Sequence, residues 1–167
     1  LWNGTTQVNV NDTLSVAALQ GLTYKTVADA NGTGTITWTV TDDGTTNGSS
    51  DPKSVSDSLS ITVTEVNDAP TRTSAAPSAV SAAEDSANTT AASLGLSGLT
   101  YGKGGGSDES SQTLTVKITA IPSFVTLWNG TTQVNVNDTL SVAALQGLTY
   151  KTVADANGTG TITWTVT

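Results

Sequence analysis

Residues 1–41 read LWNGTTQVNVNDTLSVAALQGLTYKTVADANGTGTITWTVT, and the same 41 residues return without a change at 127–167. The offset between the two copies is 126 residues. Solenoid repeats have periods of roughly 20–50 residues, whereas 126 residues is the size of a whole domain. The sequence therefore predicts a tandem array of domains, of which this chain is a window that opens within one repeat and closes within the next.

The end of the repeated segment carries the clearest strand pattern. Over residues 35–41 apolar side chains alternate with threonines, so that Ile36, Trp38 and Val40 share one face. Alternation with a period of two is typical of a strand buried on one side. We expect this face to pack on a core in both copies.

Two shorter signals precede that strand. Asn3-Gly4 supplies the positive φ angles of a two-residue hairpin turn. Ser15 can cap a helix and Gly21 can end it, which predicts about one helical turn between them.

Outside the repeat, residues 59–63 and 114–118 alternate apolar side chains with Ser, Thr or Lys, and both are predicted strands. The leucines of 94–99 mark a further strand region, and the polar stretch 42–58 is predicted to be a long loop. Proline cannot continue a β-ladder, so a domain boundary is placed near Pro70. Residues 1–69 are then the C-terminal part of one repeat and residues 70–167 the N-terminal part of the next.

The period therefore holds seven or eight short strands and almost no helix. A two-sheet antiparallel β-sandwich buries such strands economically, and a closed barrel is the alternative. The best core candidates are the large apolar residues of the three strongest strands: Trp38, Trp164, Ile61, Val63, Leu114, Val116 and Ile118.

Composition limits the classes of function. The net charge is -8, which argues against nucleic acid as a partner and suits cations. The chain has no Cys and no His, so it lacks disulfides, thiolate metal sites and the usual Ser-His or Cys-His nucleophile systems. We therefore expect no enzyme activity. No apolar run approaches the ~20 residues of a membrane span, so no membrane insertion of this segment is expected.

Three stretches together resemble a known family. The end of the period, SLSITVTEVNDAP (58–70), resembles the close of a cadherin-like repeat, where a last strand runs into an acidic Asn-Asp linker and a proline. Residues 95–122 and 28–44 extend the likeness to the tandem Ig-like or cadherin-like repeats of giant bacterial surface proteins and biofilm adhesins. Ala69 stands where the full cadherin linker would have a second Asn. The resemblance implies an Ig-like or cadherin-like antiparallel β-sandwich in an extracellular, cell-surface tandem array.

Calcium is the cofactor that the acidic clusters and the resemblance both favour, because Ca²⁺ takes six to eight oxygen ligands. Solvated acidic turns are the alternative interpretation. The candidate ligands lie near the proposed boundary, near the start of the next domain, beside a glycine loop and after a strand: Glu65, Asn67, Asp68, Glu84, Asp85, Asp108, Glu109, Asp42 and Asp43. Asp29 and Asn31 lack the full EF-hand spacing and are interpreted as an Asx-type turn.

The leading hypothesis for function is a structural extender repeat whose calcium-bound junctions stiffen a large adhesin or surface fibre. Its partners would be adjacent repeats of the same protein, joined head to tail. Two alternatives remain open: a filament subunit completed by a strand from a neighbouring molecule, and a β-sandwich module that binds a glycan or a protein. In the first two cases, residues like 42–69 should complete the sheet that 70–167 begins.

Overall fold

The computed structural model describes all residues, 1–167, and is built from antiparallel strands with very little helix. It divides into two compact units: Leu1–Val66 with Gly106–Asp108, and Asn67–Gly105 with Glu109–Thr167. No helix has the length and apolar character needed to cross a membrane. The placement of the repeat boundary near Pro70 stays a prediction.

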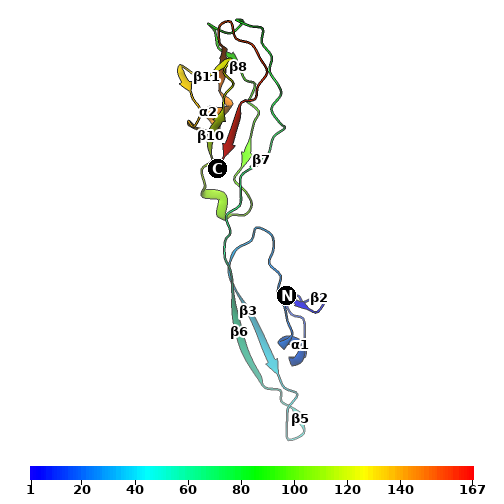
Figure 1. The fold of residues 1–167 in the computed structure, drawn as a ribbon. Coiled ribbons are helices and arrows are strands. Elements are labelled where there is room, and N and C mark those ends of the chain that lie inside the picture. The colour runs from blue at the N-terminus through cyan, green and yellow to red at the C-terminus, as the bar shows by residue number, and fades with distance from the viewer. The chain divides into compact units, whose positions relative to one another are not determined.

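The second unit is a sandwich of two sheets (Figure 1). One sheet has the order β13-β10-β15 and the other the order β12-β11-β14-β8, with every pairing antiparallel. Strands β7 and β9 form a separate pair. The strands of this unit are β7 (Thr71–Arg72), β8 (Ala92–Ser93), β9 (Tyr101–Gly102), β10 (Thr115–Ala120), β11 (Val125–Asn129), β12 (Thr132–Val134), β13 (Thr139–Ser141), β14 (Thr149–Thr152) and β15 (Thr163–Val166).

The core of the second unit lies between these sheets. Val116 and Ile118 of β10 are fully buried, and Leu127 of β11 packs in the same cluster from the other sheet. The prediction of an all-β antiparallel sandwich is therefore confirmed. The rest of the buried cluster comes from the segment before β10 and from the second copy of the repeat: Ala87, Leu94, Leu96, Leu99, Val134, Leu145, Leu148 and Tyr150.

The first unit is built around one long two-stranded ribbon, β3 with β6. The register runs from Gly32 opposite Val63 to Thr41 opposite Ser54. None of residues 1–66 is buried. The strands of this unit are β1 (Trp2–Asn3), β2 (Thr6–Gln7), β3 (Gly32–Thr41), β4 (Thr45–Thr46), β5 (Ser49–Ser50) and β6 (Ser54–Val63).

The core prediction is correct for β10 and wrong for the first unit. Trp38, Ile61 and Val63 are only half-buried there, because the β3–β6 ribbon borders an open groove, which Ile61 and Val63 line. Leu114 and Trp164 are also half-buried, at the margin of the second unit's core.

Both expected helical turns are present. Helix α1 (Val16–Gln20) begins at Ser15, whose Oγ accepts a hydrogen bond from the Ala18 N–H, and ends at Gly21. Helix α2 (Val142–Gln146) repeats this arrangement in the second copy. The turn therefore forms from local sequence alone, whatever surrounds it.

Two of the expected boundaries are wrong. Residues 42–58 are not one loop, because β4 and β5 pair as a small hairpin and β6 begins as early as Ser54. Serines can extend a strand when a threonine-rich partner lies alongside, and β3 provides that partner. The leucines of 94–99 are buried as expected, but they follow the short β8 in an irregular segment.

The two copies of the repeated segment have the same turns but different surroundings. Tyr150 pairs with Ala92 of β8 and is 8% exposed, whereas its counterpart Tyr24 is 61% exposed. In the first unit an open groove is lined by Tyr24, Ile36 and Ile61 among others. Four apolar positions are half-buried in the first copy and 0–2% exposed in the second: Leu1 and Leu127, Val8 and Val134, Leu19 and Leu145, Leu22 and Leu148.

Candidate cation sites

Two turns of the second unit bring three carboxylates together. Glu84 and Asp85 lie in the turn that precedes the buried Ala87, and Asp155 lies in the turn after β14. Asp85 and Asp155 both have left-handed backbone conformations, with φ of 60° and 54°. Aspartate tolerates this conformation better than most residues, which makes it a natural turn residue at both places.

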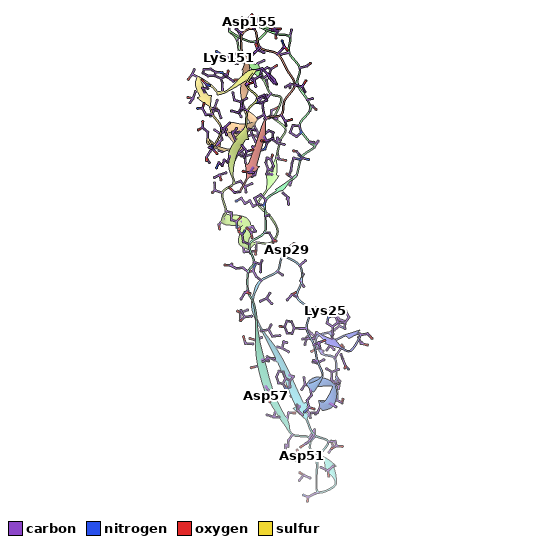
Figure 2. All side chains as sticks on the ribbon, in the orientation of Figure 1. Lys25, Asp29, Asp51, Asp57, Lys151 and Asp155 are labelled. Atoms are coloured by element: carbon purple, nitrogen blue, oxygen red, sulfur yellow. The ribbon has the colours of Figure 1, made fainter.

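The three side chains form one group. One carboxylate oxygen from each of Glu84, Asp85 and Asp155 lies within 4.8 Å of the others. The Asp155 N–H donates to Asp85 Oδ1 at 3.2 Å, and the Asn157 side-chain amide donates to Glu84 Oε2 at 3.4 Å. Figure 2 shows Asp155 at the loop end of this unit, beyond Lys151. This is the only group of three or more such residues in the chain.

The chemistry of this group is suited to a hard divalent cation. All of its ligand atoms are oxygens, and no Lys or Arg neutralises it, because the only ion pair in the chain joins Lys53 to Asp51. Three like charges held this close repel one another, and an oxygen-binding cation such as Ca²⁺ or Mg²⁺ would remove that repulsion. The group is exposed, so solvent also screens it.

Asp155 is the member that the sequence did not identify. The spacing around its counterpart, Asp29, indicates only a turn, and Asp29 does form a turn with φ of 56°. No linear signal connects Asp155 to Glu84 and Asp85, which lie 70 residues earlier. The two turns are joined in the fold by hydrogen bonds from the Ala87 N–H to Thr152 Oγ1 and from the Asp155 N–H to Asp85 Oδ1.

A second carboxylate of interest is buried. Glu109, in the 3₁₀ helix η1 (Asp108–Ser111), is 2% exposed. Its Oε1 accepts a hydrogen bond of 2.9 Å from the Asp68 N–H, whereas its buried Oε2 has no hydrogen-bond partner. A buried charged oxygen without a partner is costly, so Oε2 marks a place that a cation would stabilise.

Residues close to Glu109 hold Asn67 and Asp68, with which the second unit begins. The Gln112 side-chain amide donates to Asn67 Oδ1 at 2.7 Å, next to the Asp68–Glu109 bond. Lys103 gives Glu109 no counter-charge, because its ammonium group donates to the Ser110 carbonyl. Gly104 has φ of 121°, and a Cβ placed there would lie 2.9 Å from the Asp68 carbonyl oxygen. The site is therefore closely packed around Asp68.

The other candidate ligands are not part of such a group. Asp42 uses its Oδ1 to accept from the Lys53 N–H at 2.7 Å and from the Gly44 N–H at 3.1 Å. These two bonds, that from Lys53 first, lower the pKa of Asp42. Asp43 and Glu65 are exposed, and Asp108 is half-buried at the start of η1. Asp42 thus acts as a turn residue in this structure.

Each tryptophan of the two repeated hairpins has a lysine ammonium over its ring. The Lys25 ammonium lies 4.2 Å from the Trp2 ring centroid, and the Lys151 ammonium lies 4.7 Å from that of Trp128. The same cation–π pair forms in both copies, which identifies it as a local property of the repeated sequence.

Comparisons with protein-family models, with curated proteins and with solved structures found no match. The resemblance to cadherin-like repeats therefore stays a prediction from the sequence.

Proposed function

We propose that this chain is a structural extender: a segment of a tandem array of β-sandwich repeats in a large extracellular adhesin or surface fibre. The observation that carries the proposal is the unchanged return of a 41-residue segment at a domain-sized period of 126 residues. Each identical copy placed in series adds a fixed length, which is what an extender requires.

The segments that pack against each copy of the repeated segment support this proposal. In the second unit, the repeated segment is covered by residues from 67–121. In the first unit, the same segment pairs instead with β6, from residues that follow it in the chain. This arrangement supports domains that each take residues from before and after the repeated segment, as expected for units that follow one another head to tail.

We further propose that calcium is the cation of these units. Glu84, Asp85 and Asp155 supply three oxygen ligands from two turns, and Asn157 adds an amide next to Glu84. The unpartnered oxygen of Glu109 is a second place, next to the residues that enter the second unit. A cation at either place joins segments far apart in the sequence and limits their relative motion.

The test of the extender function is a length series. Chains that carry one, two and three additional copies of residues 42–167 are compared by small-angle X-ray scattering in calcium and in chelator. An extender increases its maximum dimension by the same increment with each added period, and calcium narrows the distribution of dimensions. A maximum dimension that stops growing as periods are added would contradict the proposal, because the units would then fold back on one another.

A further inference from the structure

The repeated strand has two edges, and each copy uses a different one. Beside β3, the Asp42 N–H donates to the Lys53 carbonyl at 2.9 Å, so even-numbered residues face β6. Beside β15, the Thr167 N–H donates to the Thr115 carbonyl at 3.0 Å, so odd-numbered residues face β10. Thr167 corresponds to Thr41, the residue before Asp42, and successive residues of a strand direct their backbone groups to opposite edges. β6 and β10 therefore occupy opposite edges of the same sequence.

The two pairings are thus compatible within one sheet. β15 ends its sheet, and its outer edge, where the even-numbered residues present their N–H and C=O groups, has no partner. In the first copy, this same edge is the one that β6 covers. Together the two units describe a four-stranded sheet with the order β13-β10-β15-β6, of which each unit holds a part.

We propose that the outer edge of β15 is a docking site for β6 of a second copy of this chain. The register follows from that of β3 by adding 126 to each residue number. Trp164 then lies opposite Asp57, Val166 opposite Val55 and Ile162 opposite Leu59. This inference goes beyond the extender function and does not depend on it.

β15, rather than β3, is the strand that keeps β6 in a completed sheet, because the two copies of the repeat differ in how much of each is buried. The copy at 127–167 contributes Leu127, Leu145 and Leu148 to the core, whereas residues 1–41 contribute no buried side chain. The first copy is therefore the one that gives up β6.

The apolar side chains of β6 suit a position beside β15. In the first unit Leu59 is 54% exposed and Val55 is 59% exposed. Both lie on the face of the ribbon that carries Ile36, Trp38 and Val40, as their register shows. The counterparts of these residues, Ile162, Trp164 and Val166, pack against the core of the second unit. Docking therefore places Val55 and Leu59 beside an existing core, which the first unit lacks.

The opposite face of the sheet, which carries the threonines and serines, also suits this docking. A hydroxyl–hydroxyl hydrogen bond of 2.8 Å joins Thr41 to Ser54, and one of 3.0 Å joins Thr167 to Thr115. Since Thr41 and Thr167 are the same position, docking continues this row across three strands, from Ser54 through Thr167 to Thr115. The length of the strand also depends on β6. The repeated strand has 10 residues beside β6 and 4 residues in the second unit, where β6 is absent.

β6 of the same molecule cannot dock on β15, because the connection between the two strands is too short. Docked β6 ends with Val63 beside Gly158, at the start of the lengthened acceptor strand. Asn67 is held by Gln112, three residues before Thr115, which pairs with Thr167 at the other end of that strand. Gly158 to Thr167 spans roughly 30 Å at about 3.3 Å per residue, whereas Val63 to Asn67 reaches at most roughly 14 Å. Each copy therefore donates to a neighbour, and such a head-to-tail contact builds an open chain of molecules unless the rotation closes a ring.

The experiment uses engineered disulfides, for which this cysteine-free chain is well suited. Thr39 and Ser56 face each other with their hydroxyl oxygens 2.8 Å apart, in a pair whose residues do not exchange backbone hydrogen bonds. Cα atoms in such pairs lie about 4.5 Å apart, which a disulfide can bridge. The corresponding docked pair is Ser56 with Thr165. Ser56→Cys in one chain is therefore mixed with Thr165→Cys in a second chain that carries a size tag, under mild oxidation. Both residues are exposed, so neither substitution disturbs a core.

The matched control replaces Thr165→Cys by Thr161→Cys, which lies on the same face but four residues out of register. The proposal expects the Ser56–Thr165 mixture to form the mixed disulfide at least tenfold faster than the Ser56–Thr161 mixture, as measured on non-reducing gels. Equal rates in the two mixtures, or no mixed disulfide in either, would overturn it. Tandem mass spectrometry of the cross-linked band confirms which two residues are joined.

Discussion

Leu19 and Leu145 occupy the same position in two identical sequences, and the structure buries Leu145 completely while leaving Leu19 half-exposed. Both side chains follow the same serine-capped helical turn. The difference comes from buried residues within 67–121, such as Leu94 and Val116, which pack in one cluster with Leu145.

This pair of leucines allows a comparison in which the local sequence is constant. Leu145→Ala is expected to lower the free energy of unfolding of the second unit by about 2–5 kcal/mol, because it removes a buried side chain and leaves a cavity. Leu19→Ala is expected to cost less than about 1 kcal/mol. Urea unfolding followed by tryptophan fluorescence measures both. Equal effects would mean that the two copies have similar surroundings in solution.

Calcium is expected to raise the melting temperature, and Asp155→Asn is expected to reduce that rise. Removing one of three carboxylate ligands weakens an oxygen site, and the stabilisation follows RT ln(1 + [L]/Kd) for a ligand that binds only the folded state. Differential scanning calorimetry in millimolar calcium and in chelator, at matched ionic strength, gives the size of the effect. The control is Asp29→Asn, which makes the same change in the other copy, outside the group of three carboxylates. If both variants respond to calcium as the unchanged chain does, the cation does not bind at Asp155.

Glu109→Gln is expected to raise the free energy of unfolding in chelator by on the order of 1 kcal/mol, because a neutral amide costs less to bury than an unpartnered charge. The Gln side chain keeps an oxygen that can accept from the Asp68 N–H. Part of the response to calcium should disappear at the same time. Glu109→Ala serves as the comparison: it leaves the Asp68 N–H without its acceptor and should destabilise the unit by about 1–3 kcal/mol. A Gln variant that is as unstable as the Ala variant would show that the charge itself is needed without calcium.

Gly104→Ala is expected to destabilise the entry into the second unit. Its backbone has φ of 121°, which L residues rarely adopt, and a Cβ would meet Asp68 Cβ at 2.7 Å. We expect a loss of about 1–3 kcal/mol and faster hydrogen exchange of the Asp68 amide, measured by NMR. Gly34→Ala is the control, because a Cβ at Gly34 meets no atom within 4 Å. Similar exchange rates at Asp68 in both variants would argue against this close contact.

Acid is expected to loosen the small hairpin of β4 and β5. Hydrogen bonds from the Lys53 and Gly44 amides lower the pKa of Asp42 below 3.8, and contacts with Lys53 and then Thr46 lower that of Asp51. A lowered folded-state pKa means that the stabilisation is present above 3.8 and is lost as the pH falls through the folded-state value. Exchange of the Lys53 amide with solvent, corrected for its intrinsic pH dependence, should therefore accelerate only below about pH 4. Protection that stays constant down to pH 2 would contradict this role of Asp42.

Much of the local structure could be predicted from residue patterns because it depends on near neighbours. The serine-capped turn, the glycine-containing hairpin and the alternation of Ile36, Trp38 and Val40 appear in both copies of the repeat or wherever a partner strand lies alongside. The class of fold, an antiparallel β-sandwich, follows from the same alternation. The acidic residues also indicated cation chemistry, and Glu84 and Asp85 do belong to the one carboxylate group of the structure.

The sequence by itself determined which strand faces are apolar, because side-chain alternation is a property of each strand alone. Only the tertiary structure decided which of those faces is covered. Tyr24 and Tyr150 have the same neighbours in sequence, and β8 lies beside Tyr150 only. The same holds for Asp29 and Asp155, of which only Asp155 meets two carboxylates. Burial and the grouping of ligands depend on segments that are tens of residues away. No local pattern shows against which copy of the repeat those segments pack.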